Sequence, residues 1–125
     1  MRRHWAYLKY VCKHKFYVFL ECLKMGVPLW IAILHDWHKF LPDEWFPYVN
    51  FFYYSNGTKR QRRDNTGYYK PDDTGDPDFD MAWFLHQKRC KHHWQTWTLE
   101  RSDGTIKLFP IPRIFICEIL ADWRG

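Results

Sequence analysis

The chain has 125 residues, a formal net charge of +5, an aromatic content of 21% and four scattered cysteines. This length allows one domain with a buried core and excludes a second catalytic domain, and the cysteine spacing excludes a zinc ribbon and a disulfide scaffold and favours thiols. The modest positive charge suits a polyanionic partner such as a nucleic acid or a phosphorylated small molecule.

The sequence has no recognisable export signal or membrane span. Its start, MRRHWAYLKY, lacks an apolar signal core and a small-residue cleavage site. The most apolar stretch, residues 16–34, is interrupted by Glu21, Lys24, Gly26 and Pro28. We therefore expect a cytoplasmic protein with no membrane partner.

A first helix is predicted from Trp5 to Met25, because the apolar residues there recur with a helical period. His14 falls inside the apolar stripe of this helix. Gly26 suits the end of the helix. The stripe consists of Tyr7, Val11, Val18, Cys22 and Met25.

A second helix is predicted from Pro28 to about Phe40, since proline suits the first turn of a helix. His35 and Asp36 lie in its second half, and His35 and Lys39, four residues apart, would share a face. The apolar contacts expected for this helix are Leu29, Trp30, Ile33, Leu34 and Trp37.

Pro42 predicts the first turn of a third helix, with Glu44 near its positive end. Residues 55–76 are rich in glycine, asparagine, aspartate and charge, which is typical of a mobile loop. Its basic and aromatic side chains could close over a phosphorylated ligand, although a solvated loop is the simpler interpretation. These side chains are Lys59, Arg60, Arg62, Arg63, Tyr68, Tyr69 and Lys70.

A fourth helix is predicted from Pro77 to about Arg89, with a preceding aspartate as its N-cap. Its buried face would consist of Phe79, Ala82, Trp83 and His86. His92 and His93 follow this helix. An Asp-Gly turn at residues 103–104 then predicts a small hairpin within residues 97–109.

Pro112 opens a last predicted helix, PRIFICEILADW, which is apolar nearly all round and is therefore expected to be buried. Glu118 and Asp122 are four residues apart and share one face of it. If they face the core, these carboxylates must be paired, protonated or coordinated. The predicted fold is all-α, a helical bundle in a single domain with a small β-hairpin before the last helix.

Several imidazole and carboxylate groups fall on or beside apolar helix faces, and these groups are typical ligands of a first-row divalent ion. A metal centre explains them together, whereas core histidines or a local His-Asp pair would need a separate reason at each position. We predict one or two ions of manganese, iron, cobalt, nickel or zinc. The candidate ligands are His14, His35, Asp36, His86, His92, His93 and Asp122.

A histidine, then an adjacent His-Asp pair, then a distant aspartate, all on predicted helices, resembles the HD-domain superfamily of metal-dependent phosphohydrolases. The stretches HD..KF..DE...Y, AW..H......HH...W and E...DW also resemble a small family of bacterial and phage proteins. The resemblance implies an HD-like helical fold in a bacterial cytoplasm, or in the host cytoplasm for a phage protein. The ligands that it implies are His14, His35, Asp36 and Asp122 for a first ion and His86, His92 and His93 for a second, with Asp36 bridging.

The combination of HDWHK with a later HH is similar to the HD-GYP group of cyclic-dinucleotide phosphodiesterases, but the glycine-tyrosine-proline signature is absent. Specificity for cyclic dinucleotides is therefore not expected. In a hydrolase, Lys39 would neutralise phosphate charge and Glu44 would orient water or act as a general base. Alternatively, these two residues form a surface ion pair.

Three functions fit these features. The first is a metal-dependent phosphohydrolase acting on a nucleotide or another phosphate ester. The second is a di-iron oxygenase, because some HD-fold members hold two irons in a similar set of ligands. The third is a non-catalytic module that binds nucleic acid through the basic loop and exposed aromatic residues.

Overall fold

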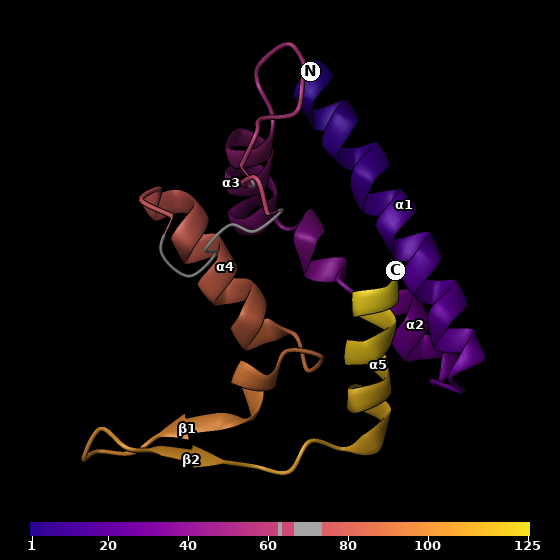
Figure 1. The fold of residues 1–125 in the computed structure, drawn as a ribbon, viewed down its shortest axis with the longest axis vertical. Helices are drawn as coiled ribbons and strands as arrows, with labels where there is room; N and C mark the ends of the chain where they lie inside the picture. Colours follow the sequence, from indigo (N-terminus) through magenta and orange to yellow (C-terminus); the bar gives the residue numbers. More distant parts are fainter. Residues whose placement is uncertain (63, 67–73) are drawn as a thin grey trace. The chain divides into compact units, whose positions relative to one another are not determined.

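The computed structural model (Figure 1) describes residues 1–62, 64–66 and 74–125. Contacts within the chain divide it into two compact units. Unit 1 comprises Met1–Lys13 and Trp37–His86, and unit 2 comprises His14–Asp36 and Gln87–Gly125. Because each unit combines two separate stretches of sequence, no single cut of the chain separates them.

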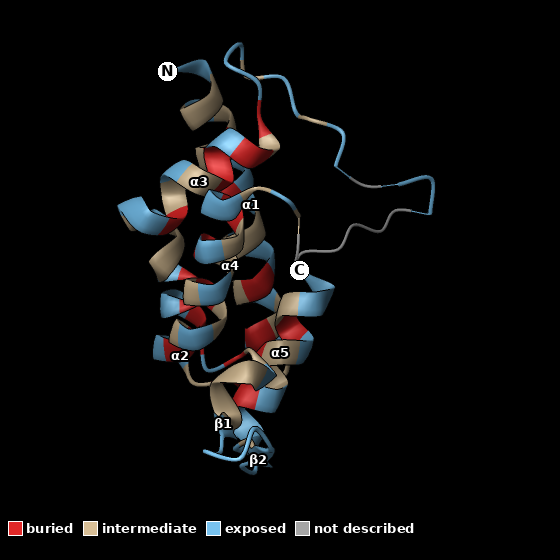
Figure 2. Cartoon of the chain, turned by 90° about the vertical axis from the view of Figure 1, so that its left-hand side faces the viewer, coloured by how far each residue is buried: buried red, intermediate tan, exposed pale blue. Residues whose placement is uncertain are grey.

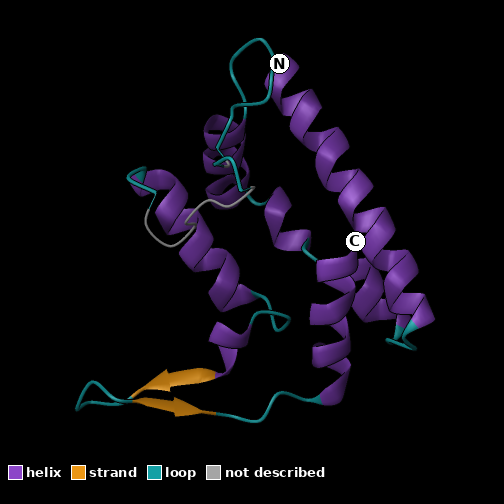
Figure 3. Cartoon of the chain, viewed as in Figure 1, coloured by secondary structure: helices purple, strands orange, loops and turns teal. Residues whose placement is uncertain are grey.

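Helices dominate the described part of the chain, and a two-stranded antiparallel hairpin precedes the last helix (Figure 3). The predicted all-α fold with a small hairpin is therefore confirmed. The elements are α1 (Arg2–Lys24), α2 (Leu29–Leu34), the 3-10 helix η1 (Trp37–Phe40), α3 (Pro42–Phe52), α4 (Pro77–Arg89), the 3-10 helix η2 (Trp94–Trp97), β1 (Thr98–Glu100), β2 (Ile106–Leu108) and α5 (Arg113–Arg124).

Unit 1 has a core built mainly on aromatic rings. The rings of Phe51 and Phe79 stack with their centroids 3.9 Å apart, and Tyr48 packs edge-on against Phe79. The predicted inner face of α4 is confirmed, since Phe79, Ala82 and His86 are buried. The core consists of Tyr7, Val11, Tyr48, Val49, Phe51, Tyr53, Phe79 and Ala82.

Unit 2 has a smaller, more aliphatic core, to which α1 contributes its C-terminal half. The predicted end of α1 is confirmed: Gly26 has a φ of 71°, and the Val27 N–H donates to the Cys22 carbonyl at 3.0 Å. Glycine adopts this left-handed conformation without steric cost. The core consists of Val18, Cys22, Val27, Ile31, Ala32, Phe115 and Ala121.

The second predicted helix is interrupted at the His-Asp pair. Helix α2 ends at Leu34, and η1 begins only after Asp36, which has a φ of 57°. A left-handed residue cannot continue a right-handed helix. The prediction of one helix to Phe40 was therefore wrong, and His35 and Lys39 do not share a face of one helix.

The apolar faces of α2 and α5 also differ from the prediction (Figure 2). Helix α2 buries Ile31 and Ala32, because six residues make fewer than two turns and cannot direct every apolar side chain to one side. Helix α5 is buried on one side only, and its Trp123 is 77% exposed. The apolar contacts predicted for the second helix are instead exposed: Leu29, Trp30, Ile33, Leu34 and Trp37.

The hairpin pairs β1 with β2 as predicted, with Leu99 opposite Lys107. Its turn uses Gly104, with a φ of 86°. Of the predicted loop at residues 55–76, Arg63 and residues 67–73, which include Tyr68, Tyr69 and Lys70, lie outside the described residues. Among the described residues, no helix combines the length and apolar character needed to cross a membrane.

Candidate metal centre

Unit 2 places His35 and Asp36 at the break after α2, where they are 1% and 3% exposed. The ammonium group of Lys15 donates to the carbonyl of His35 and, at 3.2 Å, to that of Ile33. These carbonyls have no partner within so short a helix, and a cation at a helix C-terminus also interacts favourably with the helix dipole. Lys15 therefore holds the backbone of the break in place.

His14 on α1 and Asp122 on α5 complete a cluster with this pair. The Oδ1 atom of Asp122 lies 2.9 Å from His14 Nε2 and 3.1 Å from His35 Nε2. The Oδ2 atom of Asp36 lies 3.4 Å from His35 Nε2 and 3.6 Å from His14 Nε2. The four residues offer ligand atoms that all lie within 4.8 Å of one another, close enough to hold a metal ion.

Glu118, one turn before Asp122 on α5, contacts two histidines of unit 2. Its Oε1 atom lies 3.0 Å from His35 Nδ1 and 3.3 Å from His92 Nδ1. Each ring therefore directs its other nitrogen, Nε2, toward an aspartate. His35 Nε2 faces Asp122, and His92 Nε2 lies 3.0 Å from Asp36 Oδ1. His35, His92 and Glu118 could also hold an ion between them. Glu118 also lies on the side of the His35 ring opposite Asp122, a position that suits a hydrogen-bond acceptor behind a metal ligand.

The two carboxyl groups of α5 remain ionised in spite of their burial. Burial raises the pKa of Asp122, but hydrogen bonds from His14 and His35 outweigh it and hold the pKa well below its ordinary value. Burial also raises the pKa of Glu118, and hydrogen bonds from His35 and His92 lower it by more. The cluster therefore presents negative charge to a cation.

The pKa of His92 is shifted in the opposite direction, upward, by its carboxylate neighbours. Burial lowers its pKa, but the contacts with the Asp36 and Glu118 carboxylates outweigh burial and raise the pKa to about 9. In the metal-free protein at neutral pH, His92 therefore carries the positive charge that the carboxylates attract.

The segment of unit 2 that follows α4 contains Cys90, His92 and His93. The His93 N–H donates to the Cys90 carbonyl at 3.1 Å, and the rings of His92 and His93 lie with their centroids 4.6 Å apart. Because this segment is a turn and not a helix, both rings can serve the site. His92, His93 and Asp122 offer ligand atoms within 4.8 Å of one another, as do Asp36, Cys90 and His92.

The other predicted site residues belong to unit 1. His86 Nδ1 donates to Glu44 Oε1 at 2.8 Å, and the two residues are 2% and 0% exposed. Glu44 lies in the first turn of α3, as predicted, and orients the His86 ring. Lys39 lies in η1 and is half-buried. The predicted roles of these residues in metal binding and catalysis stay predictions.

Unit 1 also contains a pocket of about 250 Å³ whose described lining is basic and aromatic. The guanidinium group of Arg62 lies 4.1 Å from the centre of the Phe51 ring, and its Nε donates to the Phe51 carbonyl at 2.8 Å. Cations beside aromatic faces suit an anion that carries an aromatic ring. The lining consists of Tyr7, Tyr10, Phe52, Tyr53, Lys59, Arg60, Gln61 and Arg62.

Three residues of the unit 2 cluster were not predicted as site residues. Glu118 is four residues from Asp122 on a common helix face, a spacing that was available as a signal. Cys90 precedes His92 by two residues, and only the turn that follows α4 brings both to Asp36. No local pattern marks Lys15, because its partners lie on another helix.

A comparison with protein-family models finds a match over residues 3–125 to the family described as "Family of unknown function (DUF5662)". The match includes every residue of the cluster in unit 2. Comparisons with curated proteins and with solved structures find no match.

Proposed function

The chain belongs to the DUF5662 family, and we propose that it is a metal-dependent phosphohydrolase acting on a nucleotide or another phosphate ester. One observation carries the proposal. Four residues of unit 2 offer ligand atoms within 4.8 Å of one another. In sequence they are a histidine, a His-Asp pair and a distant aspartate, which is the order of the HD superfamily. These residues are His14, His35, Asp36 and Asp122.

The donor set supports this choice of cofactor. Two imidazoles and two carboxylates suit manganese, iron, cobalt, nickel or zinc. Asp36 faces His35 with Oδ2 and His92 with Oδ1, an arrangement that suits two ions as well as one. A divalent ion would supply Lewis acidity for the activation of water and of a phosphoryl group.

The residues of the cluster differ in their access to solvent. The side chains of His14 and Asp122 are 17% and 20% exposed, whereas those of His35 and Asp36 are 0% and 1% exposed. A phosphorylated small molecule would therefore approach the cluster beside His14 and Asp122. Glu118 and Lys15 would act behind it, Glu118 by orienting the ring of His35 and Lys15 by fixing its backbone.

The test uses the full chain, stripped with a chelator and reloaded separately with each of the five metals. Hydrolysis of bis(p-nitrophenyl) phosphate and of a panel of nucleotides is measured together with bound metal. We expect His35→Ala and Asp122→Asn to lower both metal content and hydrolysis, the latter by more than about 100-fold. His38→Ala, outside the cluster, is the control and should retain both.

A folded, metal-loaded wild type that hydrolyses none of these substrates with any ion would contradict the proposal. Bound iron with a visible absorption band and consumption of dioxygen would instead favour the di-iron oxygenase.

The pocket of unit 1 favours a second candidate, a nucleic-acid-binding module. Its aromatic rings and cations could hold a base and a phosphate of a single strand. We would titrate metal-stripped protein into a labelled oligonucleotide at two salt concentrations. The module predicts salt-sensitive binding that Lys59→Gln and Arg60→Gln weaken, whereas Asp122→Asn and the exposed Lys107→Gln leave it unchanged. Equal binding by all four variants would exclude this pocket.

A further inference from the structure

We propose that Cys90, Asp36 and His92 form a second metal site in unit 2, with the cysteine as a thiolate ligand to a thiophilic divalent ion. This inference rests on the metal-binding part of the proposed function and is independent of the hydrolytic reaction.

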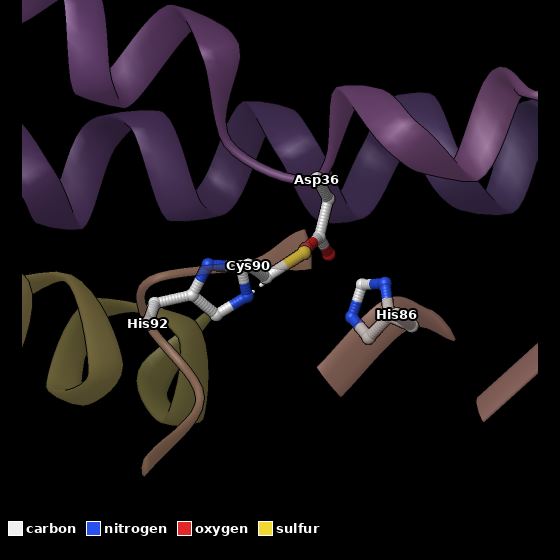
Figure 4. Close-up of side chains that lie close together, drawn as sticks. All are labelled: Asp36, His86, Cys90 and His92. Carbon is white, nitrogen blue, oxygen red and sulfur yellow. Dashed lines mark ion pairs between the residues drawn. The ribbon is translucent and has the colours of Figure 1, made fainter. Parts of the chain in front are cut away.

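The backbone after α4 sets the spacing of the two ligands from this segment. The carbonyl of Cys90 accepts the N–H of His93 at 3.1 Å and the hydroxyl of Thr96 at 2.7 Å, which closes a tight turn. Within this turn, Cys90 and His92 are two residues apart. Figure 4 shows their side chains and that of Asp36 pointing toward one another; it also labels His86, a residue of unit 1.

The burial of Cys90 is not explained by apolar packing. Buried cysteines commonly act as small apolar residues, as Cys22 does within the aliphatic core of unit 2. Cys90 is 3% exposed, yet it belongs to neither apolar core of the described chain. Its ligand-range neighbours are instead the carboxylate of Asp36 and the imidazole of His92, which are metal ligands by chemistry.

The two oxygens of Asp36 separate this site from the first one. Oδ2 lies 3.4 Å from His35 Nε2, whereas Oδ1 lies 3.0 Å from His92 Nε2. The Cys90 sulfur lies within 4.8 Å of the ligand atoms that Asp36 and His92 offer. Asp36 can therefore bridge a first site of nitrogen and oxygen ligands and a second site that also contains sulfur.

Sulfur determines which ion the second site prefers. A thiolate favours zinc, cobalt or iron over manganese, which prefers oxygen ligands. Binding converts the thiol to a thiolate, and its proton passes to solvent.

Cobalt is the probe for the test, because a thiolate bound to cobalt gives a charge-transfer absorption band in the near ultraviolet. Metal-stripped full-length protein is titrated with cobalt, and absorption and bound cobalt are measured. We expect the band in the wild type, its loss in Cys90→Ser together with one fewer bound ion per chain, and its retention in Cys117→Ser. Cys117 is a matched control because it is also in unit 2 and is partly buried.

X-ray absorption of the zinc-loaded wild type gives a second measurement that does not depend on the folding of a variant. One sulfur per chain at about 2.3 Å from zinc is expected. Bound zinc with only nitrogen and oxygen ligands, or a cobalt band that persists in Cys90→Ser, would overturn the site. Hydrolysis without a thiolate signal would refute this site alone, whereas a thiolate signal without hydrolysis would refute the phosphohydrolase alone.

Discussion

The Nδ1 atom of His35 lies 3.0 Å from Oε1 of Glu118, while its Nε2 atom lies 3.1 Å from Oδ1 of Asp122. The ring thus has a carboxylate on each side, one on the side of the candidate metal and one behind it. In the metal-loaded protein, a carboxylate that accepts the Nδ1–H would leave the lone pair on Nε2, the atom that would bind the ion in place of its hydrogen bond to Asp122.

We therefore predict that Glu118→Gln weakens metal binding by about 10- to 100-fold without loss of the fold. An amide can accept the same hydrogen bond, but it removes the negative charge that makes the imidazole a better ligand. Zinc affinity is measured by competition with a chelator of known affinity. Glu100→Gln, on the exposed strand β1, is the control, and equal zinc affinities in the two variants would contradict the role assigned to Glu118.

The backbone of Asp36 gives a second prediction. A φ of 57° is sterically unfavourable for alanine, at a cost of about 1 to 2 kcal/mol, but not for glycine. Asp36→Gly and Asp36→Ala both remove the carboxylate, so both should lose metal. Asp36→Gly should nevertheless be more stable by about 1 kcal/mol. Urea denaturation of the metal-stripped variants measures the difference, and a more stable alanine variant would show that the left-handed conformation is not retained.

The features predicted correctly from the sequence are those that local residues determine. Helix α4 begins at Pro77 because Asp76 accepts the N–H groups of Asp78 and Phe79, at 3.1 and 3.3 Å. Its apolar spacing then places His86 on the buried face. The grouping of His14, the His-Asp pair and Asp122 was predicted differently, from the resemblance to the HD superfamily and not from local pattern. These residues do lie together in unit 2, and their role as metal ligands stays a prediction.

The break after α2 could not be predicted in this way. Pro28 and the apolar run that follows it indicate a helix, and nothing nearby indicates a stop at Leu34. We attribute the break to Lys15, which lies on α1 and donates to carbonyls that a longer α2 would use itself. An interaction between distant parts of the sequence leaves no periodic pattern.

The same interaction gives a third prediction. Lys15→Met should lower the free energy of unfolding by about 1 kcal/mol, because the last carbonyls of α2 lose their donor and the compensating charge. It should also weaken metal binding, because His35 and Asp36 would no longer be held in place. Thermal and urea denaturation and zinc competition are the measurements. The control is Lys24→Met, which removes an exposed pair with Glu21 and should change stability by less than about 0.5 kcal/mol.

If Lys15→Met leaves both stability and zinc affinity at the level of Lys24→Met, the contact with the α2 carbonyls does not hold the break.

The pKa of His92 gives the last prediction, a pH dependence of the metal-free protein. Its pKa is raised from 6.5 to about 9 by Asp36 and Glu118, in spite of burial. A raised histidine pKa stabilises the fold fully below about pH 6.5, and this contribution is lost as the pH rises to about 9. We expect the free energy of unfolding to fall by about 3 kcal/mol over this range. Urea denaturation at a series of pH values measures it.

At acid pH, stability should instead fall as the pH falls. The pKa values of Glu118 and Asp122 are lowered in the folded protein, so the stability that these carboxylates contribute is lost as the pH falls below their ordinary pKa values. The metal-free protein should therefore be most stable between about pH 5 and 6.5. His92→Gln should remove the decline above pH 6.5, whereas His38→Gln should retain it. Zinc should also suppress the decline, because the ion replaces the proton of His92 between the same carboxylates. An equal decline in His92→Gln and wild type would assign it to another group.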